Sequence, residues 1–191
     1  MMKKITFALV LLSLSFLFSC DDDNERDPLV LSIDGDNLSA PFFDANVTQE
    51  AAVNFSSSLT ASHTDKSIIN IQCYLGTVPN SLVINIYGAG TSSTPGSLLH
   101  TQTVNTSNLR SNNAWYTFTL DDKISITGDD LWVGIAVQHN TRAGIIGCDP
   151  GPAVSGGDWY KRSASNFQTF RNFTGNSVDI NWNIRAGMEL D

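Results

Sequence analysis

Short runs of alternating apolar and polar residues recur along the sequence after residue 28. Alternation with a period of two is typical of β-strands that have one buried face, and no stretch keeps helical spacing for three turns. Turn-forming residues separate the runs, for example at 76–80, 88–96 and 107–113. The pattern predicts an all-β, two-sheet β-sandwich, jelly-roll-like, with about nine or ten strands. The expected strands cover residues 51–55, 67–75, 82–87, 98–104, 114–120, 123–126, 131–138, 158–162 and 179–186, with a weaker one at 29–33.

Composition agrees with an ordinary globular domain. Hydrophobic residues make up 41% of the chain and charged residues 16%, which is too apolar for disorder. The formal net charge of −8 argues against nucleic acid as a partner.

The first twenty residues have the order of a secretory signal. Two lysines precede an apolar run at 5–18 that is short for a membrane span, and Ser19 and Cys20 follow. The tetrad Leu17, Phe18, Ser19, Cys20 resembles the lipobox of bacterial lipoproteins, which implies that Cys20 is the lipid anchor. The alternative is an ordinary cleaved signal followed by a chance cysteine.

An acidic run, Asp21, Asp22, Asp23, Asn24 and Glu25, follows the cysteine. It resembles the surface-export signal of Bacteroidetes-type lipoproteins, although the Lys or Gln that often precedes the acids in that family is absent. The resemblance implies an outer-membrane anchor facing the cell exterior, with the periplasmic face as the alternative. The expected organisation is a signal peptide at 1–19, a lipidated, acidic tether at 20–28 and a single β-sandwich domain at 29–191.

Residues 50–188 resemble an accessory β-sandwich module found at the ends of secreted proteins of such bacteria. The resemblance is carried by the segments 83–87, 95–99, 131–134, 147–152 and 181–186 and by Trp115. Such modules accompany peptidases, adhesins and glycan-handling proteins, so the resemblance implies an accessory role and no catalytic residue.

The parity of each run divides its side chains into two sets, because successive residues of a strand point to opposite faces. The predicted core set is Ile69, Ile71, Cys73, Leu75, Leu82, Ile84, Ile86, Tyr116, Phe118, Leu120, Leu131, Val133, Ile135, Val137, Ile180, Trp182 and Ile184. The opposite parity is rich in amides and aromatics: Asn70, Tyr74, Asn85, Tyr87, Trp115, Trp132, Asn181, Asn183 and Arg185.

This second set suits sugar recognition, because an aromatic ring stacks on a pyranose while amide and guanidinium groups bind its hydroxyls. We expect Trp115 and Trp132 as stacking platforms, extended by Tyr74 and Tyr87. The alternative is the polar outer face of any sandwich, with Trp132 lying under a loop.

A glycine-rich stretch at 139–157 is longer than a sandwich connection needs. Two interpretations remain open. It either covers one end of the sandwich and presents Trp159 and Tyr160, or it is a structural loop with an edge strand at Ile145 and Ile146.

Two further cysteines, Cys73 and Cys148, allow a disulfide in an exported chain. Cys73 is also a natural core residue, so a free thiol is the alternative. Turn aspartates that could hold a structural Ca²⁺ are Asp129, Asp130, Asp149 and Asp158, for which plain solvated turns are the default interpretation.

Catalytic signals are thin. None of the three histidines lies in a zinc-protease pattern, and after the tether the glutamates are Glu50 and Glu189 alone. We therefore expect a non-catalytic, cofactor-free binding module of the cell envelope that recognises a polysaccharide or glycoconjugate. The alternative is an adhesion or protein-interaction subunit of an envelope complex.

Overall fold

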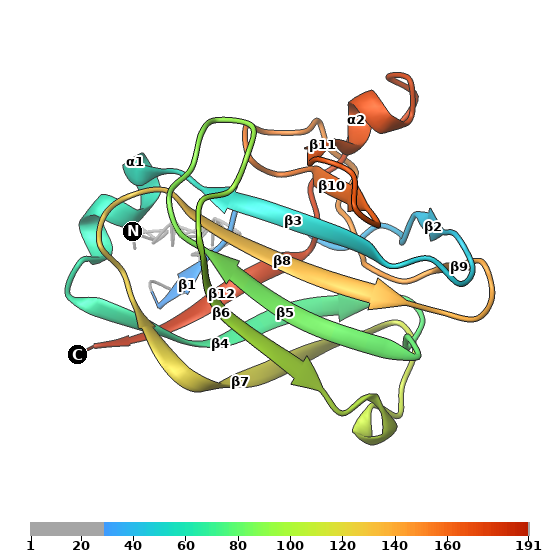
Figure 1. Ribbon diagram of the computed structural model, residues 1–191, viewed down its shortest axis with the longest axis horizontal. Coiled ribbons are helices and arrows are strands. Elements are labelled where there is room, and N and C mark those ends of the chain that lie inside the picture. Colours follow the sequence, from blue (N-terminus) through green and yellow to red (C-terminus); the bar gives the residue numbers. More distant parts are fainter. Residues whose placement is uncertain (1–28, 191) are drawn as a thin grey trace, which may run out of the picture.

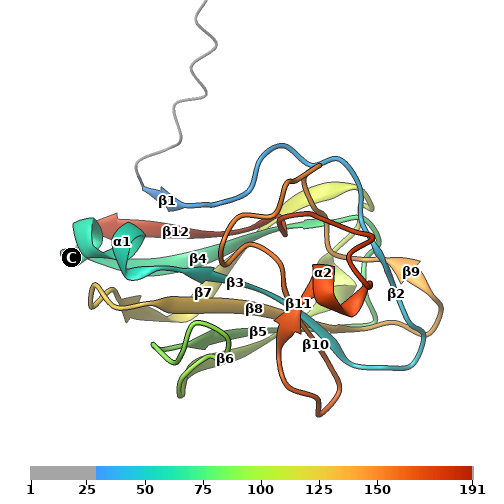
Figure 2. The same ribbon diagram turned by 90° about the horizontal axis from the view of Figure 1, so that it is seen from above.

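The computed structural model describes residues 29–190, and the predicted anchor Cys20 lies outside them. Two antiparallel sheets pack face to face, as Figure 2 shows from above. One sheet has four strands in the order β1-β12-β4-β7, and the other has six in the order β11-β10-β3-β8-β5-β6. This arrangement confirms the all-β, two-sheet fold.

The strands are mostly the predicted alternating runs. Their bounds are β1 Val30–Leu31, β2 Phe42–Phe43, β3 Gln49–Phe55, β4 Lys66–Leu75, β5 Ser81–Tyr87, β6 Leu98–Val104, β7 Ala114–Ser125, β8 Leu131–Gln138, β9 Ala143–Gly144, β10 Trp159–Arg162, β11 Gln168–Thr169 and β12 Ile184–Leu190. The short helical turns are α1 Ser57–Thr60, η1 Ala61–His63, η2 Thr106–Asn108 and α2 Phe170–Phe173. None of the helices among residues 29–190 has the length and hydropathy needed to cross a membrane.

Several predicted strand ends are shifted, and two of the differences change the topology. The runs 114–120 and 123–126 form one continuous strand, β7, which pairs with β4 through its residues 114–119 and 124–125. The run 179–186 becomes a strand of the four-stranded sheet only at Ile184. Before that point its backbone bonds with the 147–157 segment, since Asn181 O accepts from Asp149 N and Trp182 N donates to Gly157 O.

The core lies between the sheets and contains the predicted apolar set with one exception. Ile68 is fully buried in the core cluster, whereas Ile69 is half-buried. A register shift between Ile68 and Asn70 changes the parity of β4 at this point, as a bulge does. Tyr116 packs against the core from its border, where its hydroxyl donates to Ser111 O at 2.7 Å.

One end of the sandwich is filled by aromatic rings. Trp182 is fully buried, with Phe43 at 5.9 Å and Phe170 at 4.9 Å between ring centroids. Tyr160 packs on Phe43 and, with Phe173, holds α2 against this cluster. Figure 1 shows α2 and the β10–β11 hairpin at the upper right, with the small β2–β9 sheet beside them.

The edge strands β6 and β7 are joined by one side chain. The amide of Gln102 on β6 donates to Thr119 O at 3.0 Å and accepts from Asp121 N at 3.0 Å. Gln102 therefore uses two backbone groups of β7 and ties the open side of one sheet to the other.

Candidate functional site

The predicted aromatic and amide set is divided between two opposite outer faces. Tyr74, Trp115 and Arg185 belong to the four-stranded sheet, while Asn85, Tyr87 and Trp132 belong to the six-stranded sheet. The prediction of one continuous binding face is therefore wrong. Parity distinguishes inside from outside, but it does not tell which sheet a strand joins.

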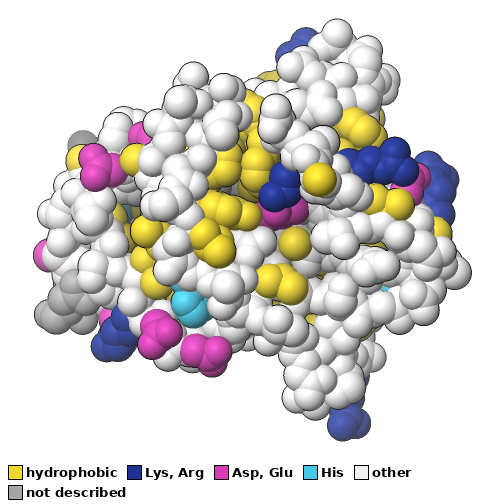
Figure 3. Space-filling model, viewed as in Figure 1, with side chains coloured by type: hydrophobic (Ala, Val, Ile, Leu, Met, Phe, Trp, Pro, Cys, Tyr) yellow, Lys and Arg dark blue, Asp and Glu magenta, His cyan; other side chains and the backbone are white. Residues whose placement is uncertain are grey.

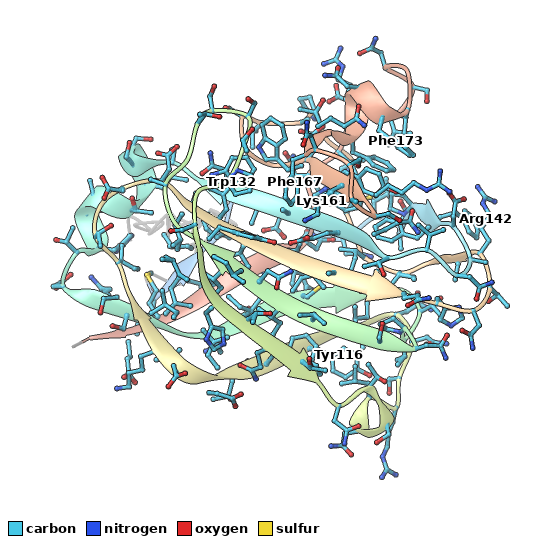
Figure 4. All side chains as sticks on the ribbon, in the orientation of Figure 1. Tyr116, Trp132, Arg142, Lys161, Phe167 and Phe173 are labelled. Carbon is cyan, nitrogen blue, oxygen red and sulfur yellow. The ribbon has the colours of Figure 1, made fainter. Side chains whose placement is uncertain are left out.

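Trp132 is fully buried and cannot stack on a ligand. Its ring lies 5.1 Å from that of Trp159 and 6.1 Å from that of Phe167, both of which belong to the β10–β11 hairpin region. Figure 4 shows Trp132 and Phe167 close together where this hairpin lies over the sheet. The prediction of a stacking platform at Trp132 is wrong, and the alternative of a covered tryptophan is confirmed.

Trp115 is 40% exposed, but its ring packs against side chains that hold the fold together. The guanidinium of Arg185 lies 4.3 Å from its ring centroid, and the Tyr74 ring meets it edge-on at 5.9 Å. Arg185 is in turn bound by the buried carboxylate of Asp34 at 2.9–3.0 Å. Trp115 thus covers an ion pair that holds the N-terminal segment to the sheet.

Asn181 and Asn183 are buried and their side-chain NH2 groups bond to neighbouring loops, so their prediction as a hydrogen-bonding fringe for a ligand is wrong. Asn181 Nδ2 donates to Asp149 Oδ2 at 2.9 Å and to Pro152 O at 3.1 Å. Asn183 Nδ2 donates to Asp34 Oδ2 at 2.7 Å. Both amides hold loops in place.

The stretch at 139–157 is an ordered structural loop. Ile145 and Ile146 are buried, and Ile146 forms a single bridge with Leu75. The edge strand itself is β9, Ala143–Gly144, two residues earlier than predicted. The loop does not present Tyr160, which is buried, while Trp159 is half-buried beside Trp132.

A continuous polar chain crosses the outer face of the six-stranded sheet. Lys161 Nζ on β10 binds Glu50 Oε2 on β3 at 2.8 Å. Asn85 Nδ2 on β5 donates to Glu50 Oε1 at 3.1 Å, and Thr101 Oγ1 on β6 donates to Asn85 Oδ1 at 2.9 Å. Since β8 lies between β3 and β5, the chain spans five neighbouring strands, and we call it the polar chain.

Gly134 lets the polar chain pass over β8. A Cβ atom at this position would overlap Glu50 Oε1 and lie 3.0 Å from Glu50 Cδ. The missing side chain therefore gives the buried Glu50 carboxylate its route from β3 to β5.

Aromatic rings border the polar chain. The Tyr87 hydroxyl donates to Glu50 Oε1 at 2.8 Å, and burial together with the Glu50 charge raises the pKa of Tyr87. The ring centroids of Phe167 and Tyr87 are 6.4 Å apart, and Lys161 Nζ lies 4.6 Å from the centroid of the Phe167 ring. Figure 3 shows hydrophobic side chains gathered in the middle of this face, with a basic and an acidic side chain at their border.

Sequence reasoning missed Glu50, Lys161 and Phe167 as site residues. Glu50 carried the clearest signal, since it directly precedes the predicted strand at 51–55 and is flanked two residues away on each side by the uncharged Thr48 and Ala52. Phe167 lies between strands, where parity provides no information.

The four turn aspartates act as anchors for backbone and side-chain donors. Asp130 accepts from Ser57 N at 2.7 Å, Asp129 from Thr127 Oγ1 at 3.1 Å and Asp158 from Arg171 N at 3.2 Å. Burial raises the pKa of Asp158. Burial acts on Asp149 in the same direction, but hydrogen bonds from Gly35, Asn181 and Gly151 outweigh it and lower its pKa. Across residues 29–190 no group of three His, Cys, Asp or Glu side chains comes together as a metal site would require.

Cys73 and Cys148 are both buried free thiols, so the disulfide interpretation is not realised. Burial raises the pKa of each thiol, and the Cys148 sulfur lies 3.5 Å from Ser39 Oγ.

No family model matches this chain, and no curated protein matches it either. A solved structure that resembles it contains the cysteine protease and lectin-like domains of Cwp84, a surface layer associated protein of Clostridium difficile. The two share 11% sequence identity with a TM-score of 0.51, and the match covers 76% of this chain. This chain spans 32% of the length of that one. At this identity the similarity shows the fold alone.

Proposed function

We propose that this protein is a non-catalytic carbohydrate-binding module that holds a glycan against the outer face of its six-stranded sheet. The observation that carries the proposal is the polar chain from Lys161 through Glu50 and Asn85 to Thr101, with Tyr87 and Phe167 beside it. A sugar ring offers an apolar face and a fringe of hydroxyls, which require aromatic and hydrogen-bonding partners side by side.

The internal bonding of the polar chain favours binding over hydrolysis. The Glu50 oxygens accept from Asn85 and Tyr87 and pair with Lys161, so the carboxylate is held in one orientation by three partners. Glycoside hydrolysis usually needs two carboxyl groups facing one bond, one of them protonated. A fixed, paired carboxylate suits the orientation of a ligand better than proton transfer.

The similar solved structure includes a lectin-like domain of a surface protein. A lectin-like role on this fold is compatible with the polar chain, and the proposal depends on the chain's own residues because fold alone does not fix function.

The proposal includes the location. The lipobox-like tetrad ending at Cys20 and the acidic run that follows support a lipid anchor on the outer membrane with the sandwich facing outward. Cys20→Ser should release the protein from the membrane fraction, while wild-type protein should incorporate labelled fatty acid. Incorporation of label into Cys20→Ser protein would contradict this part of the proposal.

Tryptophan fluorescence tests the binding face. The full protein is titrated with plant, host and microbial polysaccharides, and a saturable shift is expected because Trp132 lies beside both Phe167 and Trp159. Phe167→Ala and Thr101→Val should weaken binding, whereas Trp115→Ala, on the opposite face, should leave it unchanged. Thr101 is exposed, so its variant keeps the fold.

If the folded protein shows no fluorescence shift with any polysaccharide tested, the result would contradict the proposal and favour a protein partner. Loss of binding in Trp115→Ala but not in Phe167→Ala would move the site to the four-stranded sheet.

A further inference from the structure

A pocket of about 420 Å³ lies at one end of the sandwich, away from the polar chain. It is formed where β2 and β9 meet the loops that follow β4 and precede β7. Its functional side chains are Phe42, Thr77, Asn112, Asn113 and Arg142. Figure 4 shows Arg142 at the end of the molecule that is opposite the C-terminus marked in Figure 1.

The pocket walls are fixed to one another by backbone hydrogen bonds. Gly76 N donates to Ile145 O at 2.8 Å, and Asn113 N donates to Gly76 O at 3.1 Å. The Asn112 side chain accepts from Val78 N at 2.9 Å. Because these contacts are made within the protein, the pocket is preformed, and a ligand would not have to order its walls.

The floor is built from small residues, Ala40, Gly76 and Gly144. A Cβ atom on Gly76 would lie 2.7 Å from Ala40 Cβ, and one on Gly144 would lie 3.2 Å from the same atom. The close approach of these backbones brings the Phe42 ring and the two asparagines to the same opening.

Arg142 is the one charged group that lines the pocket. Within residues 29–190 it forms no salt bridge, unlike Arg162, Arg171 and Arg185, which pair with Asp44, Asp179 and Asp34. Its guanidinium is held 4.7 Å from the centroid of Phe42, a ring that is 62% exposed. An arginine in this state offers its hydrogen-bond fork to an external carboxylate.

We infer that this pocket is a second ligand site, which binds a sugar residue that carries a carboxylate, such as a hexuronate. The carboxylate pairs with Arg142, the apolar edge of the pyranose contacts Phe42, and Thr77, Asn112 and Asn113 face the hydroxyls. The volume lies in the range of sites for small ligands, about 300–1,000 Å³. The inference goes beyond the proposed function because it concerns a different end of the molecule and a charged ligand.

Calorimetric titration of the full protein with methyl glucuronide, methyl glucoside and acetate tests the site. We expect saturable binding of the glucuronide and none of the other two at the same concentrations. Arg142→Gln should weaken glucuronide binding by about tenfold to a hundredfold, as the loss of a charge-assisted hydrogen bond implies. Phe42→Ala should weaken it as well.

Arg110→Gln is the matched control, since Arg110 is exposed on a nearby loop and does not line the pocket. It should bind the glucuronide like wild type. Equal binding of glucuronide and glucoside, equal binding of acetate, or an unchanged Arg142→Gln variant would each overturn the inference.

Phe167→Ala separates the two sites. If it abolishes polysaccharide binding while glucuronide binding persists and requires Arg142, both sites exist. If polysaccharide binding requires Phe167 and the glucuronide does not bind, the inference fails and the proposed function stands. If the glucuronide binds through Arg142 and the polysaccharide panel is silent, the proposed function fails and the inference stands.

Discussion

Glu50 reaches its partners on β5 by passing directly over Gly134. The carboxylate is 3% exposed, and its acceptor bonds to Asn85 and Tyr87 lie on the far side of β8 from its own strand. A buried carboxylate is tolerated only where it is paired and hydrogen-bonded. The polar chain can therefore form only because residue 134 on β8 is a glycine.

Gly134→Ala should displace the Glu50 side chain and break these bonds. We expect the free energy of unfolding to fall by about 1–3 kcal/mol, since buried partners lose their hydrogen bonds. Urea unfolding measures the loss. Gly88→Ala is the control, because a Cβ there would meet Leu99 at an ordinary 3.6 Å. Equal stability of the two variants would refute the role of Gly134.

Trp132 and Trp182 differ in one hydrogen bond, although both are fully buried. Trp182 Nε1 donates to Trp159 O at 2.9 Å, whereas Trp132 Nε1 has no acceptor within residues 29–190. Replacement by Phe leaves a similar void in each case. Trp182→Phe should therefore cost about 1 kcal/mol more than Trp132→Phe in thermal or urea unfolding. A larger loss of stability in Trp132→Phe than in Trp182→Phe would show that packing, not the hydrogen bond, determines the cost of each substitution.

Asp149 and Asp158 should affect the pH dependence of stability in opposite directions. The pKa of Asp149 is lowered in the folded state, so its contribution is present above the ordinary carboxyl pKa of about 3.9 and is lost as the pH falls. The pKa of Asp158 is raised by burial, so folding becomes more favourable as the pH falls through the raised pKa toward the ordinary value, and the gain is complete below that value.

Urea unfolding between about pH 3 and pH 7 checks this contrast. Asp149→Asn should lose stability at neutral pH and show a smaller further loss in acid. Asp158→Asn should show a steeper loss in acid than wild type. Parallel pH profiles for the two variants would contradict the assigned directions.

Cys73 and Cys148 should be unreactive in the native protein. Each thiol is buried and its pKa is raised, so little thiolate is present at neutral pH. Alkylation followed by mass spectrometry should leave both residues unmodified until denaturant is added, and reductant should not change the melting temperature. A peptide pair linked through these cysteines would contradict the free-thiol state.

Much of the fold follows from sequence periodicity. The runs at 82–87, 98–104 and 131–138 agree with β5, β6 and β8 within one residue, because strands with one buried face repeat every two residues. Parity also places Ile84, Val133 and Trp182 correctly in the core. The one extra residue at the bulge in β4 reverses which side chains point inward, so that Ile68 is buried in the core where the alternation predicted Ile69.

The site was less predictable, since it depends on which strands become neighbours. Trp115 and Trp132 have the same outward parity, yet β7 and β8 enter different sheets. Burial of Trp132 depends on a hairpin about thirty residues later in the chain. Long-range pairing of this kind is set by the packing of the whole domain, which local patterns do not encode.

The Gln102 amide that joins β6 to β7 also bears on how separate molecules behave toward one another. An edge strand with free backbone groups is a template on which a second molecule can add its own strand. Gln102 already occupies the oxygen of Thr119 and the amide of Asp121. At high protein concentration these two backbone groups of β7 are therefore not free to pair with a strand of another molecule. This protects against fibre-like self-association at the side of the sandwich where β6 and β7 meet.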